Sequence, residues 1–313
     1  MKIFKPKFWN KKNNLISYAL LPFSFLLQIF LIIKKKISKN KKCSIPIICV
    51  GNIYLGGTGK TPTTIKLFKM LEKIYKKVTT AKKFYSSQED EINLLKKKTN
   101  FLTSKNRPQI IKEAINKGFK IIIFDDGLQD KNINYDLKIV CFDTLSWIGN
   151  GQLIPAGPLR EKISSLKKYD VVFLKDIAKK NNKIIKLIKN INPNIKIFNT
   201  KYVIKNLNKF NLKKKYIIFS GIGNPNSFRT FLKKNKFNIV DNIIFPDHYK
   251  YKKNDIINII KKAQNINAQI ITTEKDFIKI PKNYQRKLDY IDIDMKINQS
   301  NNFIKFLKEK IND

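Results

Sequence analysis

The sequence has few of the residues that hold metals or form disulfides. It contains one histidine, His248, and three cysteines, Cys43, Cys49 and Cys141, which show no metal-binding or redox spacing. A single histidine argues against a zinc site built on imidazoles. An odd number of thiols without spaced partners is typical of a protein from a reducing compartment.

Acidic residues are also scarce. There are 23 Asp and Glu against 64 Lys and Arg, which gives a formal charge of +41. Such a charge favours a polyanionic partner: nucleic acid, an anionic membrane face or a phosphorylated substrate. Heavy use of Lys, Asn and Ile along the whole chain explains the charge equally well as a drift in composition. Because no stretch concentrates basic residues beside stacking aromatics, no nucleic-acid partner is predicted.

Only one long apolar run is present, LISYALLPFSFLLQIFLII at residues 15–33. It approaches the roughly 20 residues that span a bilayer. Three polar residues and a proline interrupt it, namely Ser17, Ser24, Gln28 and Pro22. It is longer than the apolar part of a signal peptide, and no small-residue cleavage site is evident. Lysines on both sides favour an anchor that lies in the membrane surface and meets anionic headgroups. A buried first helix and a single spanning helix are the alternatives.

The rest of the chain alternates between short apolar runs and longer helical stretches. Nearly continuous apolar runs are typical of parallel strands covered on both faces. They occur at 46–50, 120–124, 138–142 and 170–174. Helical stretches such as 60–74 lie between them, which predicts a doubly wound α/β sheet. A second cycle of strands and helices begins at 216–225.

The length of the chain favours two compact domains. With 313 residues and 42% hydrophobic residues, the chain is long for a single core. We predict a membrane-associating helix with a basic flank at 1–44, a core domain at 45–205 and a smaller α/β domain at 206–313. Because no later apolar run is comparable to 15–33, the two domains are expected to be soluble.

A glycine-rich stretch, GNIYLGGTGKTPTT at 51–64, follows the first of these strands. Lys60 and Thr61, after Gly59, match the second half of a phosphate-binding P-loop, although Tyr54 stands where the strict pattern has glycine. Inward-turned N–H groups and a helix N-terminus bind phosphate, Lys60 would reach the β- and γ-phosphates, and Thr61 would ligate Mg²⁺. The residues predicted to contact ATP are Tyr54, Leu55, Gly56, Gly57, Thr58, Gly59, Lys60 and Thr61. A purely structural turn is the alternative.

A second motif, IIIFDDGLQ at 121–129, ends an apolar strand with two carboxylates, Asp125 and Asp126. One of them can hold Mg²⁺, directly or through water. Gly127 allows a sharp turn at the carboxyl edge of the sheet, where ligands bind in such folds. A strand-ending aspartate alone is often only a helix cap. Together with the glycine-rich loop, however, it predicts an ATP- and Mg²⁺-binding P-loop core.

Six separated stretches of the chain form a consistent set. In chain order they are VGNIYLGGTGKTP (50–62), DDGLQ (125–129), GNGQLIPAGPLRE (149–161), GIGNP (221–225), FPDHYKY (245–251) and TTEKD (272–276). Together they resemble the tetraacyldisaccharide 4′-kinase (lipid A 4′-kinase) family of Gram-negative envelopes. The stretches keep the family's order and span most of the chain. The non-glycine residue at Tyr54 is also the family's own form of the loop.

The resemblance implies a lipid kinase. Its expected reaction moves the γ-phosphate of ATP to the 4′-hydroxyl of a tetraacylated glucosamine disaccharide 1-phosphate, with Mg²⁺ as cofactor. The family works at the cytoplasmic face of the bacterial inner membrane and has an N-terminal membrane-contacting helix, which residues 15–33 fit independently. Phosphoryl transfer depends mainly on positioning and charge neutralisation, so Lys60 is expected to be catalytic.

The resemblance also implies a base and its partner. The family's Gly-Asp-Glu motif has its nearest match at 89–91, EDE, which assigns Asp90 as the base for the sugar hydroxyl; a helix cap is the alternative. His248 matches the first histidine of the family's Asp-His-His pattern and is expected to hold the carboxylate of Asp90. Asp247 is expected to orient His248.

Two further stretches have open roles. Arg160, in the loop PAGPLRE, is expected to bind an anionic group of the substrate or nucleotide, or to pair with Glu161 or another carboxylate. The motif TTEKD ends a strand of the second domain. Its Thr273, Glu274 and Asp276 are expected to touch a ligand or to cap a helix.

Three departures from the family's pattern lie near these residues. Asp130 replaces a histidine after DDG-Q, and Tyr249 replaces the second histidine of Asp-His-His. The arginine of the family's SRGYG motif is replaced by Lys82 or Lys83, which keeps the charge but loses the bidentate fork. Two other functions stay open: a membrane-attached P-loop NTPase that acts as a switch or assembly factor, and a nucleic-acid remodelling protein.

Overall fold

The computed structural model describes residues 5–36, 43–175 and 182–312. Their contacts divide the chain into two compact units. The large unit contains Lys5–Phe84, Lys98–Lys201 and Met295–Asp313, and the small unit contains Tyr85–Lys97 and Tyr202–Asp294. The units therefore differ from the contiguous ranges 45–205 and 206–313, because the chain changes unit several times. Part of the predicted basic flank, 37–42, lies outside the described residues.

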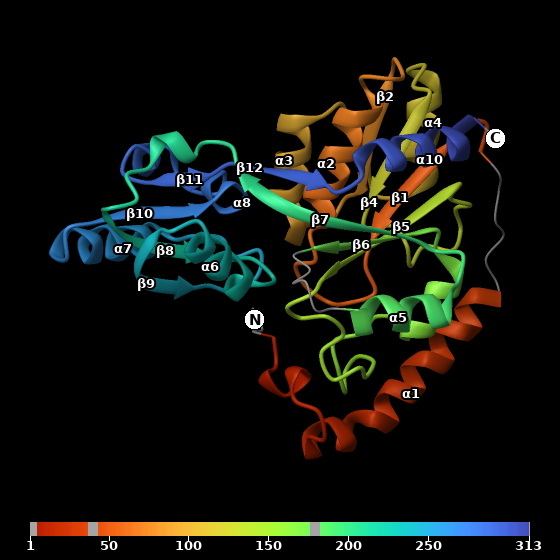
Figure 1. The fold of residues 1–313 in the computed structure, drawn as a ribbon, viewed down its shortest axis with the longest axis horizontal. Helices are drawn as coiled ribbons and strands as arrows, with labels where there is room; N and C mark the ends of the chain where they lie inside the picture. The colour runs from red at the N-terminus through yellow and green to blue at the C-terminus, as the bar shows by residue number, and fades with distance from the viewer. Residues whose placement is uncertain (1–4, 37–42, 176–181, 313) are drawn as a thin grey trace. The chain divides into compact units, whose positions relative to one another are not determined.

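The large unit is built on an eight-stranded sheet (Figure 1). Its strands are β1 (Ile47–Gly51), β2 (Val78–Lys83), β3 (Phe101–Ser104), β4 (Ile121–Asp125), β5 (Leu137–Asp143), β6 (Val171–Lys175), β7 (Lys196–Ile204) and β12 (Ile293–Ile297). Their order is β12-β7-β6-β5-β1-β4-β2-β3. The pairs from β7 to β3 are parallel, with β1 between β4 and β5. The carboxyl ends of β1 and β4 therefore meet at one edge.

Helices cover both faces of this sheet, as the continuous burial of its inner strands requires. The helices of the large unit are α1 (Leu15–Lys36), α2 (Lys60–Leu71), α4 (Arg107–Asn116), α5 (Asn182–Ile191) and α10 (Ser300–Asn312), with the 3₁₀ turns η1 (Lys7–Asn10) and η3 (Ile163–Lys168). Ile110 of α4 and Ile188 of α5 pack in one cluster with Val172 and its same-face neighbours. Phe303 of α10 packs on Phe173, which points to the opposite face. The doubly wound α/β fold is confirmed.

The small unit repeats the same logic on a four-stranded parallel sheet, in the order β11-β10-β8-β9. Its strands are β8 (Lys215–Ser220), β9 (Asn238–Ile244), β10 (Ala268–Thr273) and β11 (Asp289–Ile291). Its helices are α3 (Glu89–Lys98), α6 (Pro225–Lys234), α7 (Lys253–Asn265), α8 (Glu274–Phe277) and α9 (Lys282–Gln285), with η2 (Ser86–Gln88) and η4 (Leu207–Lys209). Two apolar clusters, one on each face of the sheet, form its core.

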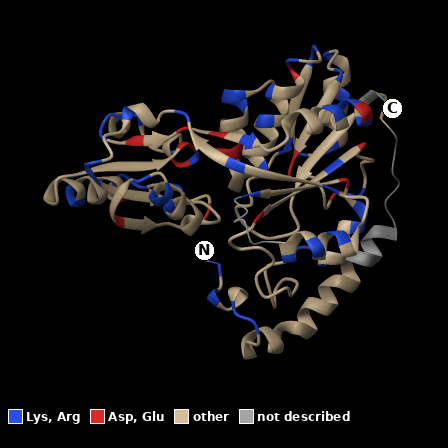
Figure 2. Cartoon of the chain, viewed as in Figure 1, with Lys and Arg blue, Asp and Glu red and all other residues tan. Residues whose placement is uncertain are grey.

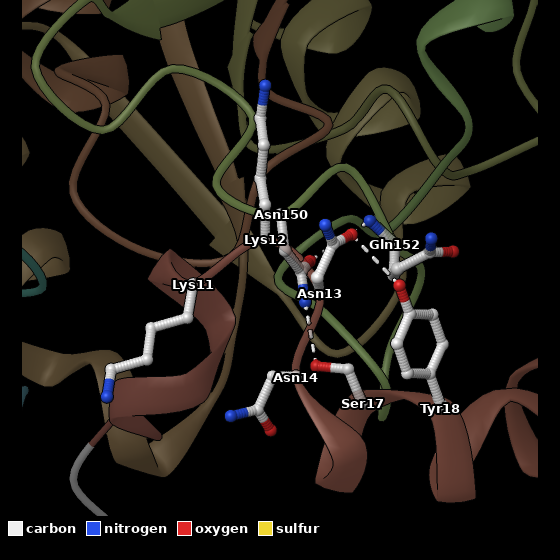
Figure 3. A pocket seen from close by; sticks show the side chains of 8 residues that line it. All are labelled: Lys11, Lys12, Asn13, Asn14, Ser17, Tyr18, Asn150 and Gln152. Atoms are coloured by element: carbon white, nitrogen blue, oxygen red, sulfur yellow. Dashed lines mark hydrogen bonds between the residues drawn. The ribbon is translucent and has the colours of Figure 1, made fainter.

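Helix α1 is attached to the large unit by polar contacts, while much of its apolar surface is exposed. Ser24 Oγ donates to Leu153 O at 3.0 Å and accepts from Ala156 N at 3.1 Å. At the start of the helix, Asn150 Nδ2 donates to Ser17 Oγ at 3.0 Å (Figure 3). These contacts bury the serines that interrupt the apolar run.

The opposite side of α1 presents large apolar side chains. Phe23 exposes 60% of its surface, and Phe25, Leu26 and Phe30 each expose 62%. A first helix buried in the domain, one of the sequence-based alternatives, is therefore wrong. Within the described residues, no helix combines the length and apolarity needed to cross a bilayer. Figure 2 shows no charged residue on the coloured part of α1, whereas lysines and arginines are spread over most other elements.

Candidate active site

The glycine-rich loop joins β1 to α2, which begins at Lys60. Gly59 precedes the helix with a φ of +92°, and Gly56 has a φ of +130°. Side chains rarely tolerate these backbone angles, so glycine is required at both points. Asn52 Nδ2 donates to Gly56 O at 3.2 Å and to Thr58 Oγ1 at 2.9 Å, which fixes the curve of the loop. The loop thus has the strand–turn–helix setting of a phosphate-binding site.

The stretch PAGPLRE lies beside this loop and pairs with it through the backbone. Leu55 N–H donates to Pro158 O at 2.8 Å, and Arg160 N–H donates to Ile53 O at 2.7 Å. Tyr54 is 1% exposed, so its side chain supports the loop from within. The backbone pairing brings the side chain of Arg160 to the sheet edge where β1 and β4 end.

Asp125, at the end of β4, is buried and bound by three side chains. Thr61 Oγ1 donates to Asp125 Oδ2 at 2.9 Å, and Thr64 Oγ1 donates to Oδ1 at 3.2 Å. Lys82 Nζ lies 3.0 Å from Oδ2, and both side chains of this ion pair are almost fully buried. Of the two lysines at the end of β2, Lys82 is the one that lies against Asp125. Its single ammonium pairs with one carboxylate oxygen.

Asp126 follows with a left-handed φ of +61°, which turns its side chain toward the glycine-rich loop. Lys60 Nζ lies 3.7 Å from Asp126 Oδ2, and Arg160 Nη1 lies 2.9 Å from Oδ1. Arg107 Nη2 donates to the main-chain oxygen of Asp126 at 2.6 Å. Its Nη1 pairs with Asp130 at 2.7 Å. The departure at Asp130 thus provides a partner for a buried arginine.

These residues could hold a metal only together with a ligand. Among the described residues, no group of three or more His, Cys, Asp or Glu side chains is arranged to bind a metal ion. Mg²⁺ is usually held by one or two carboxylates plus substrate phosphates, and the hydroxyl of Thr61 beside Asp125 and Asp126 is such an oxygen donor set. The predicted residues of the large unit are therefore brought together at one sheet edge.

In the small unit, the structure pairs Asp90 with His248. Asp90 lies in the first turn of α3, and His248 lies in the loop after β9. Asp90 Oδ1 lies 2.7 Å from His248 Nδ1. His248 has a left-handed φ of +58°, and its N–H donates to Gly221 O at 3.1 Å and to Asp247 Oδ1 at 3.0 Å. The backbone of this loop therefore fixes the direction of the imidazole.

Two lysines that the sequence did not reveal complete this cluster. Lys279 Nζ lies 3.4 Å and Lys275 Nζ lies 3.6 Å from Asp90 Oδ2. Burial alone would raise the pKa of Asp90, but the hydrogen bond with His248 and the charges of Lys275, His248 and Lys279 together lower it to about 2. Asp90 therefore stays ionised at neutral pH.

The motif TTEKD has a structural part and a charged part. Thr273 caps α8 by accepting from Asp276 N at 3.1 Å, and Asp276 Oδ2 accepts from Gly221 N at 3.0 Å. Lys275, between them, points its ammonium at the carboxylates around Asp90. The departure at Tyr249 is accommodated in the same region, because its hydroxyl donates to Asp255 Oδ2 at 3.1 Å.

The fold and the edge of the large sheet define a class of protein. A parallel sheet, a glycine loop that ends in Lys60-Thr61 at a helix N-terminus, and a neighbouring strand that ends in two aspartates are the parts of a P-loop NTPase. Members of this class bind the phosphates of a nucleoside triphosphate at this edge.

Comparison with known proteins gives the family. The model of the tetraacyldisaccharide-1-P 4′-kinases matches residues 16–312, and the chain belongs to this family. A tetraacyldisaccharide 4′-kinase of Pelagibacter ubique is 46% identical over 315 residues, covering 99% of this chain and 100% of the relative. One from Rickettsia canadensis is 34% identical, covering 99% and 97%.

A solved structure supports the fold independently. The crystal structure of LpxK from Aquifex aeolicus in complex with ATP matches with a TM-score of 0.69 and covers 95% of this chain and all of that chain. Its sequence identity is 22%, so the match bears on the fold alone.

Proposed function

We propose that this chain transfers the γ-phosphate of ATP to the 4′-hydroxyl of a tetraacylated glucosamine disaccharide 1-phosphate. Membership of the tetraacyldisaccharide-1-P 4′-kinase family supports the acceptor. The observation that carries the phosphate donor is the position of Lys60 and Thr61 beside Asp125 and Asp126, at the adjoining ends of β1 and β4.

The residues of the large unit would hold the triphosphate. Backbone N–H groups from Tyr54 to Thr61 would bind the phosphate oxygens, and the ammonium of Lys60 would neutralise charge on the γ-phosphate. For Lys60 to do so, it must leave Asp126, from which it is separated by only 3.7 Å. Arg160 stays as a partner for Asp126. Mg²⁺, held by Thr61 and the two aspartates, would neutralise the β- and γ-phosphates.

The proton of the acceptor would pass to Asp90. As the 4′-oxygen forms its bond to the γ-phosphorus and the bond to the β–γ bridging oxygen breaks, the hydroxyl proton moves to the carboxylate and ADP leaves. Asp90 is ionised because its neighbours lower its pKa to about 2. The imidazole of His248, 2.7 Å away, holds the carboxylate in place.

The exposed face of α1 would bring the enzyme to its lipid. Acylated substrates stay in the bilayer, and large apolar side chains such as Phe25, Leu26 and Phe30 are exposed on one helix. An apolar helix preceded by Lys11 and Lys12 suits the surface of an anionic membrane. We place the enzyme at the cytoplasmic face of the inner membrane, as a peripheral protein.

The test supplies the purified protein with radiolabelled ATP, Mg²⁺ and the disaccharide 1-phosphate in mixed micelles. We expect a lipid that carries a second phosphate, seen by thin-layer chromatography and by mass. ATP hydrolysis without that product would instead favour a P-loop NTPase that acts as a switch. Tight RNA binding that weakens steeply with salt would favour the nucleic-acid alternative.

A further inference from the structure

The ammonium of Lys275 stands among three carboxylates of the small unit. Its Nζ lies 3.2 Å from Glu91 Oε1, 3.4 Å from Asp247 Oδ1 and 3.6 Å from Asp90 Oδ2. These carboxylates come from two elements, α3 and the loop after β9, and Lys275 comes from a third, α8. The ammonium of Lys275 therefore links α3, which carries Asp90, to the loop after β9, which carries His248.

The contact with Asp247 extends this effect to the histidine. Asp247 Oδ1 accepts a hydrogen bond from the main-chain N–H of His248 at 3.0 Å, and the same oxygen faces Lys275. The left-handed backbone of His248 is a conformation that L residues rarely adopt, and such a conformation persists only where its surroundings enforce it. Lys275 therefore acts on the orientation of His248 as well as on the charge of Asp90.

Lys275 offsets part of the negative charge of a cluster that has more carboxylates than lysines. Four carboxylates, from Asp90, Glu91, Asp247 and Asp276, lie within one cluster with Lys275 and Lys279. Lys279 is committed more closely to Asp276, at 2.7 Å, than to Asp90, at 3.4 Å. Burial alone would lower the pKa of Lys275, but Glu91, Asp247, Asp90 and Asp276 together raise it. The four carboxylates therefore favour the charged form of Lys275.

We propose that Lys275 is a positioning residue of the phosphoryl-transfer reaction: it fixes the Asp90–His248 pair in its ionised, hydrogen-bonded form through Asp90, Glu91 and Asp247. The proposal rests on the proposed role of Asp90 as the base. It adds a third member, Lys275, to that pair, although Lys275 itself contacts no reacting atom.

The single histidine of the chain makes a direct test possible. Because His248 is the only imidazole, its ring resonances in a full-length, ¹⁵N-labelled sample in detergent need no assignment. Groups that face the pair are Glu91 on α3, Asp247 beside the histidine, and Lys275, Asp276 and Lys279 on or after α8. In Lys275→Met, we expect the ring ¹⁵N resonances of His248 at neutral pH to move away from their wild-type positions, because Asp90, Glu91 and Asp247 lose the cation that they share.

The conservative variant separates the proposal from a general loss of structure. Lys275→Arg keeps the charge and should restore the wild-type ring resonances. Lys275→Gln removes the charge but keeps hydrogen-bond donors. It should give the same change as Lys275→Met, and it serves as the test if the methionine variant does not fold. Lys97→Met is the matched control, because Lys97 lies 3.4 Å from Glu274 but is 53% exposed.

Kinetics supply the second readout. In Lys275→Met we expect kcat to fall about tenfold, with KM for ATP unchanged, because the nucleotide site lies in the other unit. The acid limb of the pH profile should move to higher pH, because Asp90 loses a neighbour that favours its charged form. Ring resonances of His248 and an acid limb that both match the wild type in Lys275→Met would overturn the proposal. A wild-type protein that makes no bisphosphorylated lipid would instead reject the proposed function, whereas the ring resonances would still report on the cluster.

Discussion

The two charged clusters of this protein are opposite in sign. At the edge of the large sheet, cations outnumber the carboxylates with which they pair: Lys60, Lys82, Arg107 and Arg160 against Asp125, Asp126 and Asp130. In the small unit, carboxylates outnumber lysines: Asp90, Glu91, Asp247 and Asp276 against Lys275 and Lys279. A surplus of cations favours the binding of a polyphosphate, whereas a surplus of carboxylates beside an imidazole favours the uptake of a proton. The charge of each cluster therefore agrees with the role that we propose for it.

The clusters also differ in how their residues are held. In the large unit, Lys60, Lys82 and Arg160 pair with carboxylates at or just after the end of β4, so these ion pairs are anchored by the sheet. In the small unit, the cluster depends on one lysine that bridges α3 and the loop after β9. We expect substitutions on the first side to act on the bound nucleotide, and substitutions on the second side to act on proton transfer.

The largest effect is expected in the cluster at the edge of the large sheet, which we propose binds the phosphates. Lys60→Ala removes the ammonium that would neutralise the γ-phosphate, and kcat should fall about 10³-fold. Turnover of radiolabelled ATP into bisphosphorylated lipid measures the change. Lys69→Ala, on the exposed side of the same helix, is the control and should leave kcat unchanged. Near-normal activity of Lys60→Ala would remove this loop from the reaction.

Substitutions in the cluster around Asp90 should lower kcat less strongly and should leave the affinity for ATP unchanged. Asp90→Asn keeps the shape of the side chain and removes the base, so kcat should fall about 10²-fold. ATP affinity, measured by titration calorimetry, should not change. Glu89→Gln is the control, because Glu89 is half exposed and pairs only at the surface with Lys250. A weaker affinity for ATP in Asp90→Asn would contradict the separation of the two sides.

The cluster at the edge of the large sheet could largely be predicted from the sequence. The motifs at 51–64 and 121–129 are contiguous, and each follows an apolar run that reads as a parallel strand. Adjacent parallel strands bring their carboxyl ends together, so Lys60 and Asp126 were expected to be close. For Arg160 the sequence left two roles open. The structure gives an ion pair with Asp126 rather than Glu161, which instead accepts from Gln129 and Tyr169.

The other cluster could be predicted only in part. Family motifs pointed to Asp90 and His248, but residue order along the chain placed Asp90 in the first domain. Contacts place 85–97 with the small unit, because α3 packs its charged first turn against residues more than 150 positions away. Lys275 lies in the motif TTEKD, but the sequence suggested roles only for the threonine and the acidic residues of that motif. In a chain with 64 basic residues, no local pattern separates one partly buried lysine from the solvated ones.

Acid should weaken the small unit through Asp90. Its pKa lies at about 2 in the folded chain against an ordinary value of 3.8, so its charged form stabilises the fold above pH 3.8. This contribution, about 2 kcal/mol, is lost as the pH falls through the folded pKa. Urea unfolding of the wild type and Asp90→Asn should show a stability gap that narrows by about half from about pH 6 to about pH 3. A gap independent of pH would show that the pKa of Asp90 is not lowered, whereas Glu89→Gln should show no gap.

The smallest effect tests whether membrane contact belongs to the large unit alone. In the double variant Phe25→Ser, Leu26→Ser, binding to anionic phospholipid vesicles should fall about tenfold, because two exposed apolar side chains of α1 no longer enter the membrane surface. Flotation of the protein with vesicles measures the change. Leu207→Ser, Ile266→Ser is the matched control, since these side chains are also exposed but lie in the small unit. Equal losses in both variants would show that vesicle binding depends on general surface properties, such as the basic charge, and that α1 is not a dedicated anchor.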